Sequence, residues 1–458
     1  MSAPSAASLG TPRGPLARAV PPERWRTPLV WLAFVLAHVW VARVGLEVWD
    51  WTLGDLGLYR WWAYMAVVDG SWPVVDYAWV YPAGGIVPMV LAGFAGLDDG
   101  GPYYLAWLVL VAVLNAAAVG MLLRHPRGRV AAAWFVAFVA LLGPAGVGRL
   151  DGFVGPLTVV ALLVALSRPR VSAALLTAGA WIKVAPGAAV LPLLLATRRP
   201  LRDVVLPAAA VCVVVVGTVV ASGGGEYLLS FVTEQGQRDL QIESVLATPF
   251  IVAGVWSSQV VRAYDDQIFT FEISAPGARA VADAATPALL VGVLAVTLLL
   301  WRVRRRAGER LWTDTVLRAD FVVRGAFALT LVLLVMNKVG SPQFTAWLAP
   351  ATAVALALGL PRWRVTAWGV LVVAGATQLV YPWNYDNVVD GLAGAAFLLA
   401  GRNLAVVVLL VVAVRELVRF SATSAAGAGP AADASGAVRG EPAEQVGARA
   451  AVVDRGVG

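Results

Sequence analysis

Residues 103–129 read YYLAWLVLVAVLNAAAVGMLLRHPRGR, and this stretch decides the fold class. Residues 103–123 carry no charged side chain, whereas Arg124, Arg127 and Arg129 follow directly. An α-helix of about 20 apolar residues spans the hydrocarbon core of a bilayer, and Arg and Lys collect in cytoplasmic loops. The stretch therefore predicts a transmembrane helix that ends at the cytoplasmic surface.

Apolar runs of similar length recur along the whole chain. Of its 458 residues, 59% are hydrophobic and 14% are charged, and the mean hydropathy is +0.76. This composition indicates a polytopic helical membrane protein. We expect an all-α bundle of about twelve transmembrane helices. The expected spans are residues 28–48, 103–123, 130–147, 153–167, a hairpin of two short helices within 171–197, 203–221, 280–301, 321–337, 343–359, 364–380 and 392–414.

The net charge of +7 does not indicate a nucleic-acid-binding protein, because the basic residues form short clusters between apolar runs. Membrane topology requires such clusters. The single cysteine, Cys212, lies within an apolar run, which excludes a disulfide framework. With His38 and His125 as the only histidines, a histidine-rich metal site is excluded as well.

The apolar stretch 80–97 is interrupted by proline and glycine and needs a separate decision. If it crossed the membrane, the arginines at 124–129 would lie outside and Asp98 and Asp99 inside, against the usual charge bias. If it lies at the interface, or enters and returns, every later basic cluster falls on the cytoplasmic side. We adopt the second arrangement, which places the loops rich in acidic and aromatic residues outside.

The expected domain organisation follows from this topology. Residues 1–27 are expected to form a flexible cytoplasmic tail and residues 28–415 the transmembrane domain. Residues 421–458 lack hydrophobic periodicity and are expected to be a disordered cytoplasmic tail. The outer face carries a first loop at 50–102 with interfacial helices and a long segment at 222–279. We expect a multi-pass protein of the plasma membrane with both termini in the cytoplasm.

The candidate functional residues all lie in the outer loops. Asp55 could act as a general base on an acceptor hydroxyl, or it could cap a short helix at 56–67. Lys183 has apolar neighbours, and it either extends to the outer headgroups or binds a lipid phosphate with help from Arg238 or Lys338. The other candidate substrate-binding residues are Tyr59, Asp76, Tyr81, Arg149, Asp151, Gln241, Glu243 and Gln343.

Six short segments, in this order along the chain, resemble those of a known family. They are DLGLY at 55–59, GSWP at 70–73, DYAWVYP at 76–82, AWIKVAP at 180–186, RDLQIES at 238–244 and NKVGSPQFTAW at 337–347. The set resembles glycosyltransferase family 87. Its members are polytopic GT-C type enzymes that use polyprenyl-phosphate sugars, among them actinobacterial α-mannosyltransferases of phosphatidylinositol mannoside synthesis. The resemblance covers about residues 28–415.

The resemblance implies an acidic catalytic base in the first outer loop, which falls on Asp55, and an interfacial helix after Tyr81-Pro82. Two positions depart from the family pattern. Residues 148–151 read GRLD where the family usually reads Gly-Gln-x-Asn, and residues 81–83 read YPA where it reads Tyr-Pro-Pro. These departures affect the identity of the sugar and of the acceptor, and the first could mark a subfamily.

Together the residues and the resemblance predict an inverting membrane glycosyltransferase. It would move a hexose, expected to be mannose, from a polyprenyl phosphate to a lipid or glycan acceptor on the extracytoplasmic face, with Asp55 as the base. Lys183, Arg238 and Lys338 would stabilise the departing lipid phosphate. No metal or other cofactor is expected, although a metal could bridge Asp55, Asp76 and the phosphate. The expected partners are the donor, the acceptor and membrane lipids, and no nucleic acid.

Two other protein classes remain open from the sequence. A transporter or flippase of lipid-linked sugars also uses broken helices and charges at membrane depth, but the chain shows no clear internal repeat and its polar residues collect on one side. A non-catalytic scaffold would not require Lys183 or the clustered acids. Replacing Asp55 with Asn separates these classes, because a transferase should lose turnover while it retains donor binding.

Overall fold

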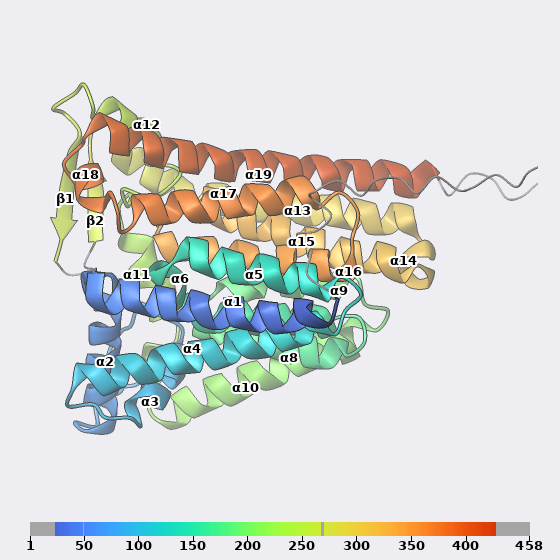
Figure 1. The fold of residues 1–458 in the computed structure, drawn as a ribbon, viewed down its shortest axis with the longest axis horizontal. Coiled ribbons are helices and arrows are strands. Elements are labelled where there is room, and N and C mark those ends of the chain that lie inside the picture. Colours follow the sequence, from blue (N-terminus) through green and yellow to red (C-terminus); the bar gives the residue numbers. More distant parts are fainter. Residues whose placement is uncertain (1–22, 49, 267–269, 427–458) are drawn as a thin grey trace, which may run out of the picture.

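The structure is a computed structural model that describes residues 23–48, 50–266 and 270–426. Most of the described chain is helical, and the longest helices run side by side along the long axis of the molecule (Figure 1). One antiparallel β-hairpin is the only sheet in these ranges. The helical membrane protein expected from the apolar runs is confirmed at this level.

Five helices of the described chain are long and apolar enough to cross a bilayer. Two of them face outward over most of their surface, since only 11% of the most apolar stretch of α10 and 17% of that of α13 is buried. The five helices are α1 (Glu23–Arg43, continued by a π-helical turn at Val44–Val48), α4 (Gly100–Leu123), α10 (Leu206–Ala221, preceded by a π-helical turn at Leu201–Val205), α13 (Ala278–Ala307) and α19 (Ala393–Ala426).

Helix α15 (Thr315–Val335) lies in the interior of the bundle. Nearly every residue from Ala319 to Val335 is buried, so the helix is covered on all sides, as its apolar sequence without a polar face requires. The shorter helices that complete the bundle are α5 (Gly128–Leu142), α7 (Asp151–Val164), α8 (Pro169–Ile182), α9 (Val190–Leu195), α16 (Ala349–Leu358) and α17 (Arg364–Val380).

Small side chains let α16 approach its neighbours closely. Ala349, Ala351, Ala353, Ala355 and Ala357 alternate along the helix, and all five are buried. Lipid tails are as apolar as these side chains, so helices in a bilayer associate through close van der Waals packing. The alternation places alanines on several sides of α16, which packs against α5, α7 and α15.

The predicted spans coincide with helices, but several of these helices are short. Helix α5 has 15 residues and α7 has 14, whereas a complete crossing needs about 20. The hairpin expected within 171–197 consists of α8, a 3₁₀ turn at Ala185–Ala189 and α9. The number of about twelve spans and the GT-C type therefore stay predictions beside the five long helices.

Short elements gather at one end of the bundle (Figure 1). Within the stretch 80–97 there is only a 3₁₀ turn and the eight-residue helix α3, which at 1.5 Å per residue is about 12 Å long and too short to span a bilayer. The short elements at this end are α2 (Gly54–Val67), α3 (Ile86–Gly93), α6 (Pro144–Val147), α11 (Ser230–Gln237), α12 (Thr248–Ala253), β1 (Val261–Asp265), β2 (Thr270–Ser274) and α18 (Tyr385–Val389).

The expectation of an all-α protein is wrong for Val261–Asp265 and Thr270–Ser274, which are strands. Strands β1 and β2 pair antiparallel, with Val261 opposite Ser274, and residues 240–242 pair with the other edge of β2. There, Ile242 N donates to Phe271 O at 3.1 Å and Ile273 N donates to Leu240 O at 2.8 Å. The strands carry the β-branched and aromatic residues typical of sheets, but they are too short to show in an analysis of apolar runs.

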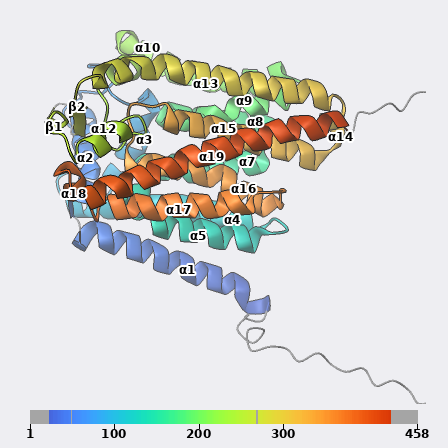
Figure 2. The ribbon, with the colours of Figure 1, turned by 90° about the horizontal axis from the view of Figure 1, so that it is seen from above.

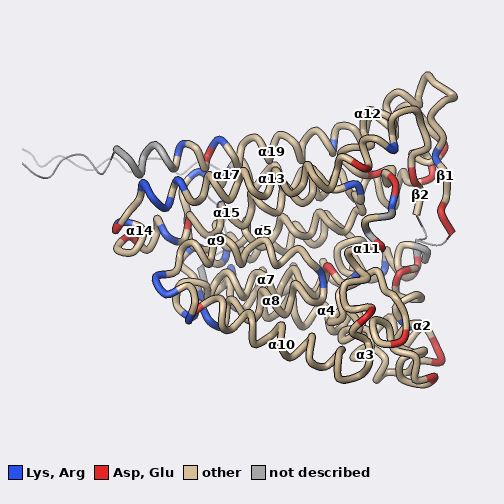
Figure 3. Tube along the Cα trace, turned by 180° about the vertical axis from the view of Figure 1, so that it is seen from behind, with Lys and Arg blue, Asp and Glu red and all other residues tan. Residues whose placement is uncertain are grey.

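Charge is distributed unequally between the two ends of the bundle (Figure 3). Lys and Arg gather at what we call the basic end, around α9, α14 (Arg310–Thr313) and the segments at 124–129 and 302–310. Asp and Glu gather at the opposite, acidic end, which carries α2, α3 and the hairpin. Helix α1 begins and α19 ends at the basic end (Figure 2).

The two predicted tails lie mostly outside the described residues. Residues 1–22 and 427–458 are not described, so the expected flexibility of these segments stays a prediction. Helix α19 continues to Ala426, beyond residue 421, where the disordered tail was expected to begin.

A buried ionic cluster joins α15, α19 and the loop before α17 at the basic end. Arg324 Nε lies 2.7 Å from Asp320 Oδ2 within α15, and Trp363 Nε1 donates to Asp320 Oδ1 at 3.0 Å. Glu416 of α19 lies 4.0 Å from Arg324 and 3.6 Å from Arg362. The cluster thus connects α15, α19 and the residues before α17, far from the acidic end.

Candidate active site

A cavity of about 730 Å³ lies at the acidic end. Its walls come from distant parts of the chain: the start of α2, residues 80–81, Arg149, residues 238–243, both hairpin strands, residues 341–343 and residues 381–386. This volume is within the range of small-molecule sites. It is the place where the outer loops predicted from the sequence meet.

Seven of the twelve predicted site residues line this one cavity. They are Asp55, Tyr81, Arg149, Arg238, Gln241, Glu243 and Gln343. The remaining five, whose surroundings are described below, are Tyr59, Asp76, Asp151, Lys183 and Lys338.

Asp55 forms a two-point ion pair with Arg149. The guanidinium Nε lies 3.0 Å from Asp55 Oδ2 and Nη2 lies 3.3 Å from Oδ1. Arg149 also donates to Tyr381 OH at 2.8 Å and to Thr52 O at 3.3 Å. The side chain of Arg149 is buried, whereas that of Asp55 is 33% exposed, so the arginine holds the carboxylate in place and leaves it accessible from the cavity.

The alternative role of Asp55 as a helix cap is wrong. Helix α2 begins at Gly54 with Leu53 at the capping position, and no side chain caps it. Asp55 lies within the first turn, where a carboxylate interacts favourably with the helix dipole, and its carboxylate bonds Arg149.

Lys183 has an ionic partner within the protein. Its Nζ lies 4.0 Å from Asp151 Oδ2 and sits 4.7 Å from the ring centre of Tyr81 and 5.2 Å from that of Phe344. Asp151 also accepts a hydrogen bond from Trp347 Nε1. The side chain of Lys183 is 14% exposed, so most of it is buried within the protein. It stands behind Tyr81 rather than in the lining of the cavity.

The two charged positions of the GRLD segment therefore each have a partner. Arg149 pairs with Asp55, and Asp151 pairs with Lys183. Burying a charge requires such a partner. The departure from the usual Gly-Gln-x-Asn pattern adds two charges, and both are matched locally.

Segment 238–244 is fixed by backbone pairing on both sides. Gln241 N donates to Lys338 O at 3.0 Å, on the side opposite β2. A Cβ at Gly340 would lie 2.2 Å from the Cα of Ser244, so only glycine allows this close approach. The two predicted motifs at 238–244 and 337–347 thus lie against each other.

Gln241 and Lys338 hold this arrangement together. Gln241 Oε1 accepts from Gly340 N at 2.9 Å and from Ser341 Oγ at 3.1 Å, and its Nε2 donates to Thr270 Oγ1 at 3.0 Å. Lys338 Nζ donates to Gly236 O at 2.7 Å. Lys338 thus binds the backbone two residues before Arg238, and it is not part of the cavity lining.

Arg238 lines the cavity, and no described carboxylate accepts a hydrogen bond from its Nε. Its Nε is buried and has no hydrogen-bond partner among the described residues. Burial lowers the pKa of Arg238, while the charges of Tyr81, Glu272 and Asp265 oppose that shift. A guanidinium that lines a cavity and lacks a partner for a buried N–H is suited to bind an anion such as phosphate.

Glu243 is the other buried acid in the cavity wall. It is 1% exposed, and it accepts a hydrogen bond from Tyr385. Arg402 Nη1 donates to the backbone oxygen of Glu243 at 3.4 Å. Burial raises the pKa of Glu243 to about 7, while the nearby Arg402 and the Tyr385 hydroxyl oppose that rise.

Tyr59 and Asp76 support the fold around the cavity. Tyr59 is 1% exposed, and its hydroxyl lies 3.4 Å from that of Tyr81. Asp76 Oδ2 accepts a hydrogen bond from Trp72 N at 2.7 Å within the loop after α2. Tyr59 thus contacts Tyr81 of the cavity wall, whereas the exposed Asp76 stabilises its own loop, and neither residue lines the cavity.

Sequence reasoning did not select Tyr381, Tyr385 and Arg402 as site residues. The two tyrosines line the cavity, and their rings pack 5.2 Å apart between Arg149 and Glu243. A signal was present for each: two tyrosines and an acid in the short outer loop at 381–386, and a lone arginine inside the apolar span 392–414. Their contacts depend on residues more than 140 positions away, which the sequence does not reveal.

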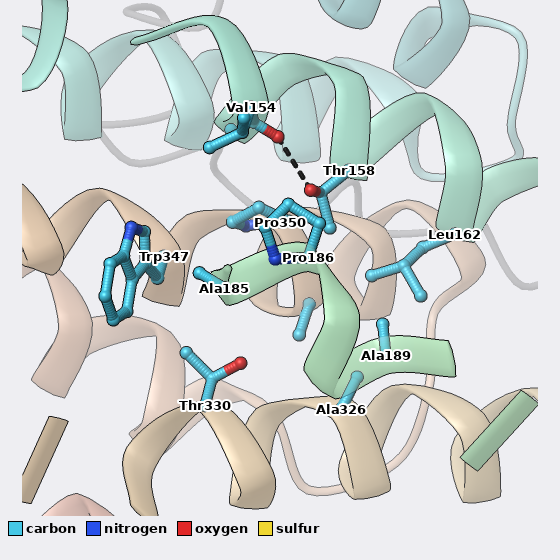
Figure 4. A pocket seen from close by; sticks show the side chains of 12 residues that line it. Val154, Thr158, Leu162, Ala185, Pro186, Ala189, Ala326, Thr330, Trp347 and Pro350 are labelled. Atoms are coloured by element: carbon cyan, nitrogen blue, oxygen red, sulfur yellow. Dashed lines mark hydrogen bonds between the residues drawn. The ribbon is translucent and has the colours of Figure 1, made fainter. Parts of the chain in front are cut away.

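A much smaller hollow of about 20 Å³ lies deeper in the bundle, among α7, the turn at Ala185–Ala189, α15 and α16 (Figure 4). Thr158 Oγ1 already donates to Val154 O at 2.6 Å. The rest of the lining is apolar apart from Thr330 and Trp347. The volume is about that of one water, and the lining supplies no ionisable group.

Within the described ranges, no group of three or more His, Cys, Asp or Glu side chains is placed to hold a metal ion. The expectation that no metal or cofactor assists stays a prediction.

Residues 79–325, more than half of the chain, match the sequence profile of glycosyltransferase family 87. The chain belongs to glycosyltransferase family 87. The matched region includes Tyr81, Arg149, Lys183 and Glu243 but begins after Asp55. No curated protein and no solved structure shows a significant match to the chain. The family predicted from the sequence is confirmed, and with it an activity of the glycosyltransferase class that acts on a sugar donor and an acceptor.

Proposed function

We propose that this family 87 protein transfers a hexose, mannose in the first instance, from a polyprenyl phosphate to a lipid or glycan acceptor. The observation that carries the proposal is the presence of an accessible carboxylate, Asp55, and an anion-binding guanidinium, Arg238, in one cavity. Transfer from a sugar phosphate requires both groups. The carboxylate takes the proton of the acceptor hydroxyl, and the guanidinium stabilises the phosphate that leaves.

In the proposed reaction the acceptor hydroxyl attacks the anomeric carbon of the donor sugar. Asp55 takes the proton of that hydroxyl, and the new C–O bond forms on the face opposite the phosphate, which inverts the configuration. The bond between the anomeric carbon and the phosphate oxygen breaks with its electron pair on that oxygen. Arg238 meets the negative charge that develops on the departing lipid phosphate.

Arg149 and Tyr381 are assigned a positioning role in this scheme. The two hydrogen bonds from Arg149 fix both oxygens of Asp55, and Tyr381 accepts from the same guanidinium. A base whose orientation is fixed before the substrate binds needs less reorganisation during the reaction. Lys183, with Asp151, is assigned to the support of Tyr81 rather than to the phosphate.

A lipid-linked donor is supported by the apolar part of the cavity wall. Leu58, Trp62 and Val80 line it alongside the charged groups, and the cavity lies at the end of a bundle with long apolar helices. Because basic loops remain in the cytoplasm, the acidic end is assigned to the extracytoplasmic face. The plasma membrane follows as the proposed location.

The test is transfer of radiolabel from polyprenyl-phosphate mannose to membrane lipids by wild type, Asp55→Asn and Arg238→Gln. Wild type should produce a labelled glycolipid. Asp55→Asn should lower kcat by about 10²–10⁴-fold while it retains donor binding. Arg238→Gln should lower transfer by about 10²–10³-fold.

Arg43→Gln is the matched control for Arg238→Gln, because Arg43 pairs with Glu47 on the surface of α1. It should leave transfer unchanged. Transfer only from a different polyprenyl-phosphate sugar would retain the mechanism and replace mannose. If wild type consumes no polyprenyl donor, or if Asp55→Asn transfers as fast as wild type, the proposed function is wrong.

A further inference from the structure

Two buried oxygens in the cavity wall have no hydrogen-bond partner. They are Glu243 Oε2 and Gln343 Oε1, which have no partner among the described residues, and both belong to residues that line the cavity. Glu243 is 1% exposed and Gln343 is 8% exposed. Buried polar atoms in folded proteins nearly always have a partner, so two such atoms at one cavity indicate that a ligand supplies the missing donors.

The neighbouring Gln241 shows that polar side chains of this cavity can be fully used within the protein. Gln241 lines the same cavity, but its amide oxygen accepts two hydrogen bonds and its amide nitrogen donates one. Its hydrogen-bonding groups are thus occupied within the protein by Gly340, Ser341 and Thr270. Glu243 and Gln343 each retain an oxygen that can still accept a hydrogen bond. Glu243 lies two residues after Gln241, and Gln343 lies on the loop that Gln241 binds.

The surroundings of Glu243 fix its position, but within the described part of the chain one of its side-chain oxygens has no partner. Asn403 Nδ2 donates to the backbone oxygens of Ser244 at 3.1 Å and of Glu243 at 3.4 Å. On the side chain, Tyr385 donates to the carboxyl group. Rotation about the last side-chain bond is broad for Glu and Gln, so either oxygen can turn toward a ligand without movement of the backbone.

We propose that Glu243 and Gln343 form a subsite that binds hydroxyl groups of a sugar ring, in addition to the groups assigned to Asp55 and Arg238. This inference rests on the proposed function and specifies how its cavity recognises a sugar. Carboxyl and amide oxygens accept hydrogen bonds from hydroxyls. The ring is either the transferred hexose or a sugar headgroup of the acceptor, since both present the same hydroxyl chemistry.

Such a subsite would make the enzyme selective. A site built to hydrogen-bond a hydroxyl rejects an analogue that lacks it, because its own polar groups are then left unpaired. The charged and titratable groups near Glu243 include Tyr385, Tyr381, Arg402 and Arg149. Because burial raises the pKa of Glu243 to about 7, its carboxyl group can also donate a hydrogen bond in its protonated form near neutral pH.

The test uses mannose donors on polyprenyl phosphate that lack one hydroxyl each, at carbons 2, 3, 4 or 6, and octyl mannoside acceptors with the same deletions. Wild type should lose about 10- to 100-fold in kcat/KM for at least one analogue, the range for a hydrogen bond to a charged group. Glu243→Ala and Gln343→Leu should lose a similar factor with the complete sugar. They should then show less than about threefold discrimination against that analogue, because the partner of the missing hydroxyl is already absent.

Glu243→Gln retains an acceptor oxygen and should recover most of the activity that Glu243→Ala loses. Glu226→Gln is the control, because Glu226 is exposed at the acidic end and outside the cavity lining. Thermal unfolding of each purified variant shows whether it is folded. A response to deoxy donors assigns the subsite to the transferred sugar, and a response to deoxy acceptors assigns it to the acceptor.

Three outcomes would overturn the inference. The first is unchanged discrimination in folded Glu243→Ala and Gln343→Leu. The second is a loss of kcat in Glu243→Gln as large as in Asp55→Asn, which would make Glu243 the base instead. The third is that the wild type consumes no polyprenyl donor. This result would refute the proposed function as well, and it differs from the first two because it is seen with the wild type alone.

Discussion

Glu243→Gln provides a test of the site that requires no substrate. The side chain is 1% exposed, and burial raises its pKa from 4.5 to about 7 in the folded protein. Glutamine has nearly the same shape and can accept the hydrogen bond of Tyr385, but it does not ionise. The substitution therefore removes one titration and leaves the packing in place.

The sign of the effect follows from proton binding. Between about pH 4.5 and pH 7 the unfolded chain has released the proton of Glu243, whereas the folded protein retains it. The folded state binds more protons in this window, so the stability of the wild type falls as the pH rises and becomes level above about pH 7. The difference between 7 and 4.5, at about 1.4 kcal/mol per pH unit, gives about 3 kcal/mol.

The expected result is that the stability of Glu243→Gln, relative to that of the wild type, increases as the pH rises. At pH 4 the two proteins should differ little, and at pH 8 Glu243→Gln should be about 3 kcal/mol more stable relative to that baseline. The unfolding entropy is roughly 1 kcal/mol per kelvin for a chain of 458 residues. The gain therefore corresponds to about 3 °C in Tm.

The assay is thermal unfolding of the detergent-purified protein, followed by intrinsic tryptophan fluorescence at half-unit steps from pH 4 to pH 8.5. Each variant is plotted as its difference from wild type, which removes the titrations that the proteins share. Glu226→Gln, at an exposed position, should give a flat difference curve. A flat curve for Glu243→Gln, or one that falls with pH, would refute a buried carboxyl group with a raised pKa.

Three further predictions follow from the contacts at the two ends of the bundle. Arg149→Leu should cost about 2–3 kcal/mol of stability, which is less than for a fully buried pair because Asp55 is 33% exposed. Transfer should also fall, and unchanged activity in the folded variant would contradict the positioning role. Arg324→Leu leaves Asp320 buried without its cation and should cost about 3–5 kcal/mol, which the double replacement of Asp320 and Arg324 by Leu should largely restore. Its transfer rate per folded molecule should stay at the wild-type level, because the cluster lies at the basic end. Treatment with EDTA should leave transfer unchanged, as measured by label incorporation before and after addition of Mg²⁺ or Mn²⁺, and a loss that either ion reverses would show a metal requirement.

The membrane class and the position of the helices follow from the sequence alone. The cause is local: about 20 uncharged residues in a row have few other stable arrangements, and basic clusters mark the cytoplasmic loops. The prediction that Asp55, Arg238 and Glu243 lie on the outer side comes from the same argument. Seven of the predicted residues line one cavity because loops on one side of a bundle converge.

The roles of individual residues depended on the tertiary structure. Asp55 pairs with Arg149 across 94 positions, and the Asn403 side chain holds the backbone of Glu243 across 160 positions. Lys183, expected to reach headgroups or bind phosphate, is neutralised by Asp151, and Gln241 is used by the backbone. A sequence shows which residues can ionise or hydrogen-bond. Only the folded chain decides which of them satisfy one another and which remain for a substrate, because each buried charge takes the nearest partner in space, whatever its distance along the chain.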